Sequence, residues 1–96
     1  MKHIIRTELA GVFYGEMADL EQVPSGNIVT IKNCRRLWYW KGANSLSQLA
    51  MDGPAVPREC KFTVIVPEMR VFNAKEIIPC SEKAESVIDA VPVWKY

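Results

Sequence analysis

Alternating apolar and polar residues cover most of this chain, which is the pattern of half-buried β-strands. The stretches with this pattern span residues 3–8, 10–21, 28–40, 61–66 and 68–79. The sequence VPSGN at 23–27 lies between two of them and has the composition of a tight turn. The pattern therefore predicts about five strands with a hairpin between the second and third, and Pro67 is expected to separate the last two.

Within the longest β-like stretch, residues 28–40, strict alternation divides the side chains between two faces. One face carries Val29, Ile31, Leu37 and Tyr39, and the other carries Thr30, Lys32, Cys34, Arg36, Trp38 and Trp40. Asn33 and Arg35 interrupt the first face halfway along the stretch. We therefore expect a bulge, a bend or a second buried surface at this point.

Two short segments have helical spacing instead, and a serine precedes each of them. Ser45 and Gln48 have the S-x-x-Q spacing of a capping box, and a Gly-Pro pair at 53–54 ends the segment. Ser81 precedes a second segment with apolar residues at helical spacing, which are Ala84, Val87, Ile88 and Val91. Strands combined with two short helices predict an α+β fold: a small antiparallel sheet of about five strands in one domain, residues 1–96.

Size and charge narrow the possible functions. The chain has 96 residues and a formal net charge of +1, from 12 basic and 11 acidic residues. A protein that binds by neutralising many phosphates has a clear excess of positive charge, so the composition argues against a nucleic-acid partner. A core this small stabilises a fold only modestly, and assembly into a homo-oligomer is therefore expected.

The cysteines and the N-terminus bear on the cellular compartment. Cys34, Cys60 and Cys80 are odd in number and form no CxxC pair, which is unlike a disulfide scaffold. We expect them to be reduced and mostly buried. The N-terminus lacks the apolar stretch of a signal peptide, and no segment approaches the roughly 20 apolar residues of a membrane span. The expectation is a cytoplasmic protein that does not contact a membrane.

Residue sets for common catalytic and metal sites are missing from the sequence. His3 is the only histidine, so any nucleophile–histidine arrangement would have to include it. Zinc-type ligand spacing, the dinucleotide motif and the P-loop motif are absent. Glu16, Asp19 and Glu21 could act as acid and base in a phosphodiesterase-like enzyme, although a solvated strand and turn explain them more simply. We therefore expect a binding protein that is not an enzyme and uses no metal or cofactor.

Residues 33–45 contain the most informative chemistry in the chain. Two tryptophans, one tyrosine, two arginines and one lysine lie there, directly before the capped helix. Arginines donate paired hydrogen bonds to phosphate, aromatic rings stack on bases, and helix N-termini attract anions. The residues expected to bind a planar anion are Arg35, Arg36, Trp38, Tyr39, Trp40, Asn44, Ser45 and Ser47. The same composition also suits a buried core, a subunit interface, or a surface for a partner protein or nucleic acid.

Several segments also resemble a family of short phage and prophage proteins of unknown function. The resemblance rests on residues 32–40 (KNCRRLWYW), 42–43 (GA), 45–50 (SLSQLA), 11–15 (GVFYG), 76–80 (EIIPC) and 91–94 (VPVW). It implies an accessory phage protein, and small phage proteins of this kind often act against host defences. Some of them hold nucleotide immune signals, such as cyclic dinucleotides or ADP-ribose derivatives, in pockets of homo-oligomers.

These features lead to a first hypothesis: a homo-oligomeric protein that captures a small nucleotide signal in the host-cell cytoplasm without cleaving it. The main alternative is a protein-interaction module that inhibits a host defence enzyme or nuclease. Its contact surface would be the aromatic cluster or the tail from Trp94 to Tyr96. A third possibility is a nucleic-acid-binding protein that uses the same arginines and aromatic residues.

Overall fold

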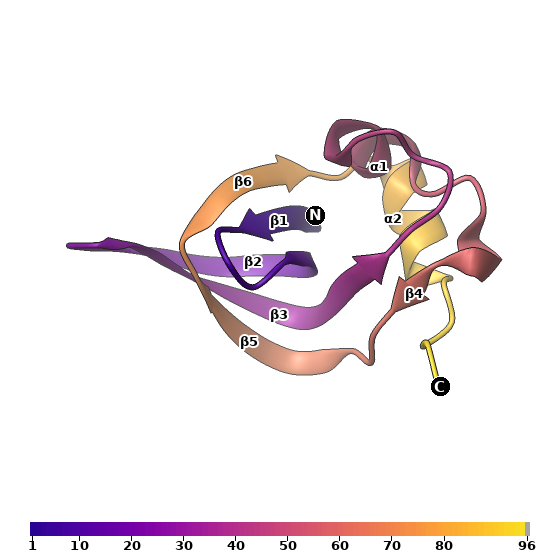
Figure 1. Ribbon diagram of the computed structural model, residues 1–96. Coiled ribbons are helices and arrows are strands. Elements are labelled where there is room, and N and C mark those ends of the chain that lie inside the picture. The colour runs from indigo at the N-terminus through magenta and orange to yellow at the C-terminus, as the bar shows by residue number, and fades with distance from the viewer. Residues whose placement is uncertain (96) are drawn as a thin grey trace.

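A long hairpin is the centre of the computed structural model, which describes residues 1–95 (Figure 1). The strands are β1 (His3–Thr7), β2 (Val12–Val23), β3 (Gly26–Tyr39), β4 (Lys61–Phe62), β5 (Val66–Phe72) and β6 (Ala74–Pro79). The helices are α1 (Leu46–Asp52), α2 (Glu82–Asp89) and the single 3₁₀ turn η1 (Pro57–Glu59). All strand pairs are antiparallel, in the order β4-β3-β2-β1-β6, and β5 also pairs with β3. The expected α+β fold is confirmed, with six strands in place of about five.

The sheet curls because β5 and β6, which follow one another directly in the chain, pair with strands on opposite sides of it. β5 lies beside β3 and leads directly into β6 beside β1, as the bend from β5 to β6 in Figure 1 shows. The turn is made at Asn73, which has a positive φ of 59°. The side chain of Asn27, at the start of β3, fixes this corner by accepting a hydrogen bond from the Ala74 main-chain nitrogen at 2.9 Å.

The expected strand break at Pro67 is wrong, and so is the expected single strand over 68–79. Pro67 lies inside β5, which pairs only with β3, and an edge strand tolerates a residue without an N–H. The chain leaves the sheet earlier, at residues 63–65, and turns later, at Asn73.

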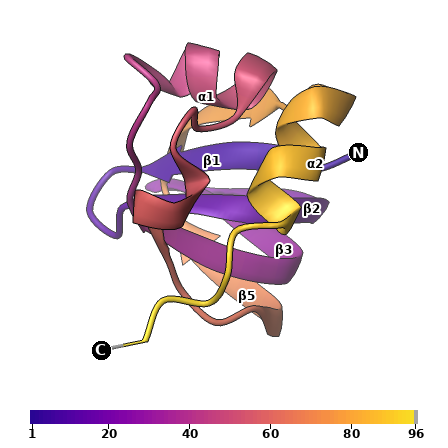
Figure 2. The ribbon, with the colours of Figure 1, turned by 90° about the vertical axis from the view of Figure 1, so that its right-hand side faces the viewer.

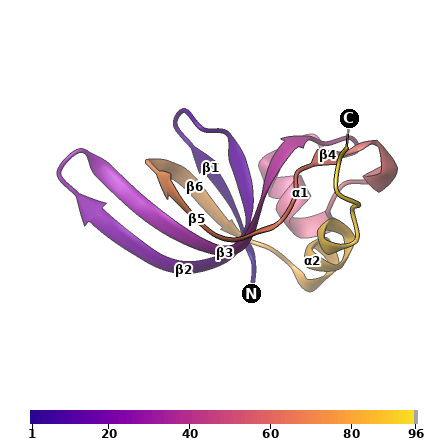
Figure 3. The same cartoon turned by 90° about the horizontal axis from the view of Figure 1, so that it is seen from below.

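Both faces of the central strands are buried, and each face belongs to a separate core. Neighbouring residues point in opposite directions: Ile4 and Tyr14 into the core beneath the helices, and Ile5 and Phe13 into the core inside the curl. The core beneath the helices also contains Leu37, Leu49, Ala50, Phe62, Ala84, Ile88 and Val91, with the two cysteines Cys60 and Cys80. The helices lie across one end of the sheet, while the β2–β3 hairpin projects from the other (Figures 2 and 3).

Asn33 forms a bulge in the long strand, one of the three features that the sequence allows there. It has a positive φ of 50°, and β3 has one extra residue where Tyr14 pairs with Arg35 and Glu16 pairs with Lys32. Gly15 lies opposite, where a Cβ would be only 2.6 Å from the side chain of Ile31. The absence of a side chain at this position therefore makes room for the bulge.

The bulge reverses the direction of every side chain that follows it in β3. Ile31 points into the curl, but after the bulge Cys34 takes that direction and Leu37 faces the helices. The expected grouping of Leu37 with Val29 and Ile31 on one face is therefore wrong.

Both helices begin as the sequence predicts. The Ser45 hydroxyl accepts a hydrogen bond from the Gln48 main-chain nitrogen at 3.1 Å, and the Ser81 hydroxyl accepts one from Ala84 at 3.0 Å. Ser81 also donates its hydroxyl hydrogen to the Met51 carbonyl at 2.5 Å, which joins the start of α2 to α1. The two helices are thus positioned as a pair over the sheet.

Arg35 holds the end of α2 and the loop after β4 against the sheet. Its side chain is only 2% exposed, and its Nε donates to the Thr63 carbonyl at 3.1 Å. Its Nη1 donates to the carbonyls of Ile88 at 3.3 Å and Val91 at 3.0 Å, and Nη2 donates to Phe62 at 3.4 Å. A cation near the last carbonyls of a helix is also favoured by the helix dipole.

Replacing Arg35 with methionine is expected to destabilise the fold by at least about 2 kcal/mol, because several carbonyls would lose their donor in a buried site. Urea unfolding monitored by circular dichroism measures this change. Arg58→Met is the matched control on an exposed residue and should change stability by no more than about 0.5 kcal/mol. Equal stability of the two variants would show that the Arg35 contacts do not hold the fold together.

Candidate functional site

Three aromatic rings and one ammonium group gather on the surface near the end of β3. We call Trp38, Tyr39, Lys61 and Trp94 the aromatic–lysine cluster. The Trp38 and Trp94 rings are stacked, with centroids 5.2 Å apart and planes 13° from parallel. Lys61 Nζ lies 5.2 Å from the Trp38 ring centre, 5.9 Å from that of Tyr39 and 5.5 Å from that of Trp94.

The fold brings these residues together from three separate segments. Trp38 and Tyr39 end β3, and Lys61 lies in β4, where it pairs with Tyr39. Trp94 follows α2 and reaches the cluster because its main-chain nitrogen donates to the Phe62 carbonyl at 2.9 Å. Val93 forms a parallel bridge with the same residue of β4. The tail is thus held beside β4 by main-chain contacts.

The cluster is open to solvent. Trp38 is 59% exposed, Tyr39 44% and Trp94 38%. Large aromatic side chains are usually buried, so their exposure on one surface needs a reason other than core packing. Exposed aromatic residues are available to stack on a ligand or to contact a partner.

A groove of about 420 Å³ adjoins the cluster and adds a second cation to it. It is lined by Tyr39, Arg58, Glu59, Cys60, Lys61 and Trp94. Glu59 is paired with Lys41 at 3.2 Å, while Arg58 and Lys61 take part in no ion pair among residues 1–95. A planar anion could therefore stack on an aromatic wall of this groove and place its charge near two cations.

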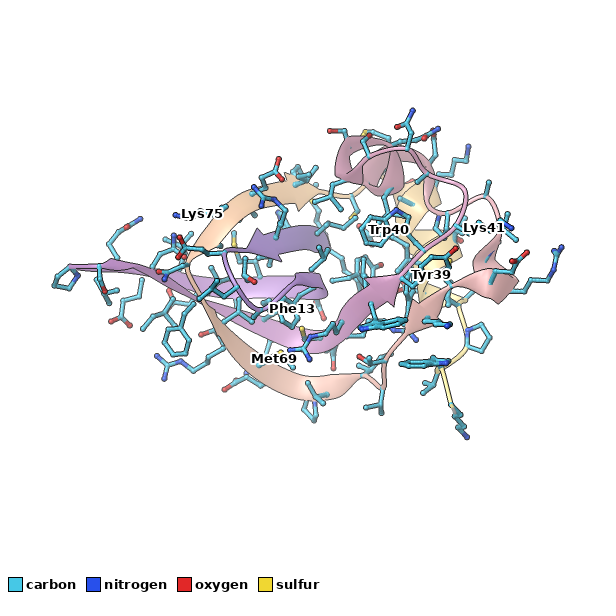
Figure 4. All side chains as sticks on the ribbon, viewed as in Figure 1. Phe13, Tyr39, Trp40, Lys41, Met69 and Lys75 are labelled. Carbon is cyan, nitrogen blue, oxygen red and sulfur yellow. The ribbon has the colours of Figure 1, made fainter. Side chains whose placement is uncertain are left out.

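The eight residues that the sequence predicts to bind a ligand lie in different parts of the structure. Trp38 and Tyr39 lie in the cluster, as Figure 4 shows for Tyr39 near the end of β3. Trp40 is half-buried and packs against the core beneath the helices. Arg36 lies elsewhere, with its guanidinium 4.8 Å above the ring centre of Phe13.

Arg35 needs a correction, because its donors already bind main-chain carbonyls in the interior. The sequence shows that Arg35 interrupts an apolar face, but the bulge at Asn33 turns it toward the helices. We therefore leave Arg35 out of the candidate site.

The helix start does not contribute an anion site either. Ser45 accepts a hydrogen bond from Gln48, and the Gln48 side chain accepts one from the main-chain nitrogen of Asn44 at 2.8 Å. These groups cap α1, which has only seven residues. Ser47 is exposed on the same helix and lies outside the lining of the groove.

Sequence reasoning missed Arg58 and Lys61 and placed Trp94 only on a tail. No local pattern connects them, because Lys61 lies 23 positions and Trp94 lies 56 positions after Trp38 in the chain. Trp94 could have been found from the two aromatic residues of VPVW and KY near the end of the chain, if they were expected to contact the end of β3.

The groove beside the cluster contains one thiol, that of Cys60. Cys34, Cys60 and Cys80 are buried and free, as expected, and burial raises the pKa of Cys60 in the groove. Across residues 1–95, no three histidine, cysteine or acidic side chains meet closely enough to hold a metal ion. Glu16 lies on the exposed part of the hairpin, where it accepts a hydrogen bond from Asn33 at 2.9 Å.

The fold and the cluster define a small α+β domain with an exposed aromatic and cationic surface. A family model described as a domain of unknown function, DUF6948, matches residues 1–88, and the chain belongs to this family. The match ends before Trp94, so one ring of the cluster comes from beyond the matched segment. No curated protein and no solved structure matches the chain. In the part of the chain that the structure describes, every helix is too short to cross a bilayer.

Stability is expected to fall as the pH rises above about 9, where unfolded thiols lose their protons. Burial raises the pKa of Cys34 and of Cys80 from 9.0 to about 11. The folded state therefore holds these protons more tightly, and its advantage is complete below pH 9 and lost as the pH approaches 11. Burial, together with a hydrogen bond to Asp89, also raises the pKa of Tyr14, which acts in the same direction.

Urea unfolding midpoints measured from pH 7 to pH 10.5 follow this loss. Cys34→Ala should make the decline shallower, because one of the two thiols no longer titrates. Urea unfolding midpoints that stay constant up to pH 10.5 would show that folding does not raise the pKa of these thiols.

Proposed function

We propose that this protein binds a small nucleotide in the groove beside the aromatic–lysine cluster and holds it without converting it. The observation that supports this proposal is the meeting of exposed aromatic rings with two cations that form no ion pair among residues 1–95. The base would stack on Tyr39 or Trp94, and the phosphate would pair with Arg58 and Lys61. This arrangement replaces Arg35 and the start of α1 as the anion site.

The magnitudes of the two contacts suit reversible capture. Stacking of one base on an aromatic side chain contributes about 1–3 kcal/mol. A hydrogen bond to a charged group contributes about 1.5–3 kcal/mol. Since the Lys61 ammonium already lies over three rings, it is held in place before the ligand arrives. Such preorganisation reduces the entropy that binding costs.

Holding rather than cleaving is inferred from the groups that line the groove. Its carboxylate, Glu59, is paired with Lys41, and its thiol, Cys60, is buried with a raised pKa. A general base needs a free lone pair within reach of the proton that it takes. His3 lies in β1 and does not line the groove.

The resemblance to phage and prophage proteins suggests which nucleotides to test first. Capture of a cyclic dinucleotide or an ADP-ribose derivative would allow an accessory phage protein to suppress a host immune signal in the host-cell cytoplasm. A homo-oligomer would place two such grooves together or complete each with a neighbouring copy. Sedimentation of the free protein and of the protein mixed with nucleotide tests whether such an oligomer forms.

A protein partner is the second candidate, and one observation favours it. Val64 and Ile65, which connect β4 to β5, are exposed large apolar residues close in sequence to the cluster. Their segment is held next to β3, because the Thr63 main-chain nitrogen donates to the Arg36 carbonyl at 3.0 Å. An apolar surface beside exposed tryptophans is typical of an interface. A host protein that binds here should lose affinity in Ile65→Asp, whereas nucleotide binding should not change.

Binding of ADP-ribose and of cyclic dinucleotides is expected by isothermal titration calorimetry, with the ligand recovered intact after heat denaturation. Arg58→Gln and Lys61→Gln should each weaken binding by roughly 10- to 100-fold, as expected for the loss of one charge-assisted hydrogen bond. Arg70→Gln removes the same type of charge outside the groove and serves as the control.

Two outcomes would contradict the proposal. Unchanged affinity in both Arg58→Gln and Lys61→Gln would exclude the groove as the site, and release of a converted ligand would make the protein an enzyme. Absence of heat with every nucleotide tested would favour the protein partner.

A further inference from the structure

A second pocket, of about 280 Å³, lies at the mouth of the core inside the curled sheet. It is lined by the β1–β2 loop, by Phe13 of β2, by Arg36 of β3, by the end of β5 and by Asn73 at the turn that follows β5. Figure 4 shows Phe13 and Met69 close together on the sheet, away from Tyr39 at the end of β3. The pocket shares no lining residue with the groove beside the cluster.

The floor of this pocket is apolar. Phe13 and Val71 belong to the core inside the curl and are almost completely buried, and the half-buried Met69 packs against them. At the rim, Leu9 is 94% exposed. Apolar rim and floor together favour an apolar group in the pocket, because such a group would remove this surface from water.

Arg36 gives the pocket a positive charge. Its guanidinium lies over the Phe13 ring and takes part in no ion pair among residues 1–95. Arg70 points to the opposite face of β5, because the alternating neighbours Met69 and Val71 face the core inside the curl. The one acidic residue of the lining, Glu8, is 3.9 Å from Lys75 and accepts a hydrogen bond from Asn73 at 3.5 Å. The Arg36 guanidinium is therefore the charge that remains to be paired.

We propose that this pocket binds a small apolar carboxylate, with its chain or ring on Phe13 and Met69 and its carboxylate on Arg36. The size agrees with this ligand class, since a cavity of about 150 Å³ holds benzene. At 280 Å³ the pocket has room for a ring or a short chain together with a charged head group. Arginine is suited to the head group because its planar fork matches the geometry of a carboxylate.

The test titrates octanoate into the protein and follows it by calorimetry and by ¹H–¹⁵N correlation spectra. Saturable binding is expected, with the largest shifts at Ala10, Phe13 and Asn73, and octan-1-ol should bind at least ten-fold more weakly because it lacks the charge. Arg36→Gln, a change on an exposed side chain, should weaken octanoate binding by about ten-fold or more.

Arg58→Gln is the matched control, because it removes an arginine from the other groove and should leave octanoate binding unchanged. Arg36→Gln should in turn leave nucleotide binding unchanged, because Arg36 does not line that groove, and either site can therefore fail without the other. The proposal is overturned if octanoate does not bind, if octan-1-ol binds equally well, or if Arg36→Gln retains full affinity. Shifts confined to the aromatic–lysine cluster would also overturn it.

Discussion

Arg35 is a charged group in the interior, and the positions of several other segments follow from its hydrogen bonds. An unpaired buried charge is costly, so the guanidinium must keep its donors occupied in the folded state. Its partners are main-chain carbonyls of Phe62 and Thr63 after β4, of Ile88 at the end of α2 and of Val91 in the tail. Burial lowers the pKa of Arg35, but the guanidinium pKa is high enough for the charge to remain.

These contacts explain why the aromatic–lysine cluster exists. β4 carries Lys61 next to Phe62, and the tail carries Trp94 three residues after Val91. Arg35 binds both segments at the neighbouring carbonyls, which places the Lys61 ammonium and the Trp94 ring above the end of β3. The residue that the sequence suggests as a ligand contact thus acts as the support of the site. Its bonds to main-chain atoms also make its role independent of the side chains of its partners.

The sequence predicts those parts of the fold that depend on local patterns. The hairpin turn at 23–27, the capping serines Ser45 and Ser81 and the bulge near Asn33 are all confirmed, because each depends on residues close together in the chain. The bulge reverses the alternation after it, so Leu37 was assigned to the wrong face. The sequence also predicts a strand break at Pro67, which is wrong, because the position of Pro67 on an edge strand cannot be inferred from its neighbours in the sequence.

The candidate site was predictable only in part, for the same reason. Trp38 and Tyr39 stand out by composition, but their partners Lys61 and Trp94 come from segments that only the tertiary fold brings near. Alternation alone could not show that Arg35 is buried while Arg36 is exposed, since this depends on the bulge. The exposed aromatic rings beside Arg58 and Lys61, rather than the arginine pair, are therefore the feature that the proposed function depends on.

The three tryptophans allow the most direct test of this account, because they lie in different environments. Trp38 and Trp94 are exposed in the cluster, and Trp40 is half-buried against the core. We would titrate ADP-ribose into ¹⁵N-labelled protein and follow the three indole N–H signals, assigned by single Trp→Phe variants. The account predicts saturable shifts at Trp38 and Trp94 with little change at Trp40. Shifts largest at Trp40, or no shift at any of the three at millimolar ligand, would contradict it.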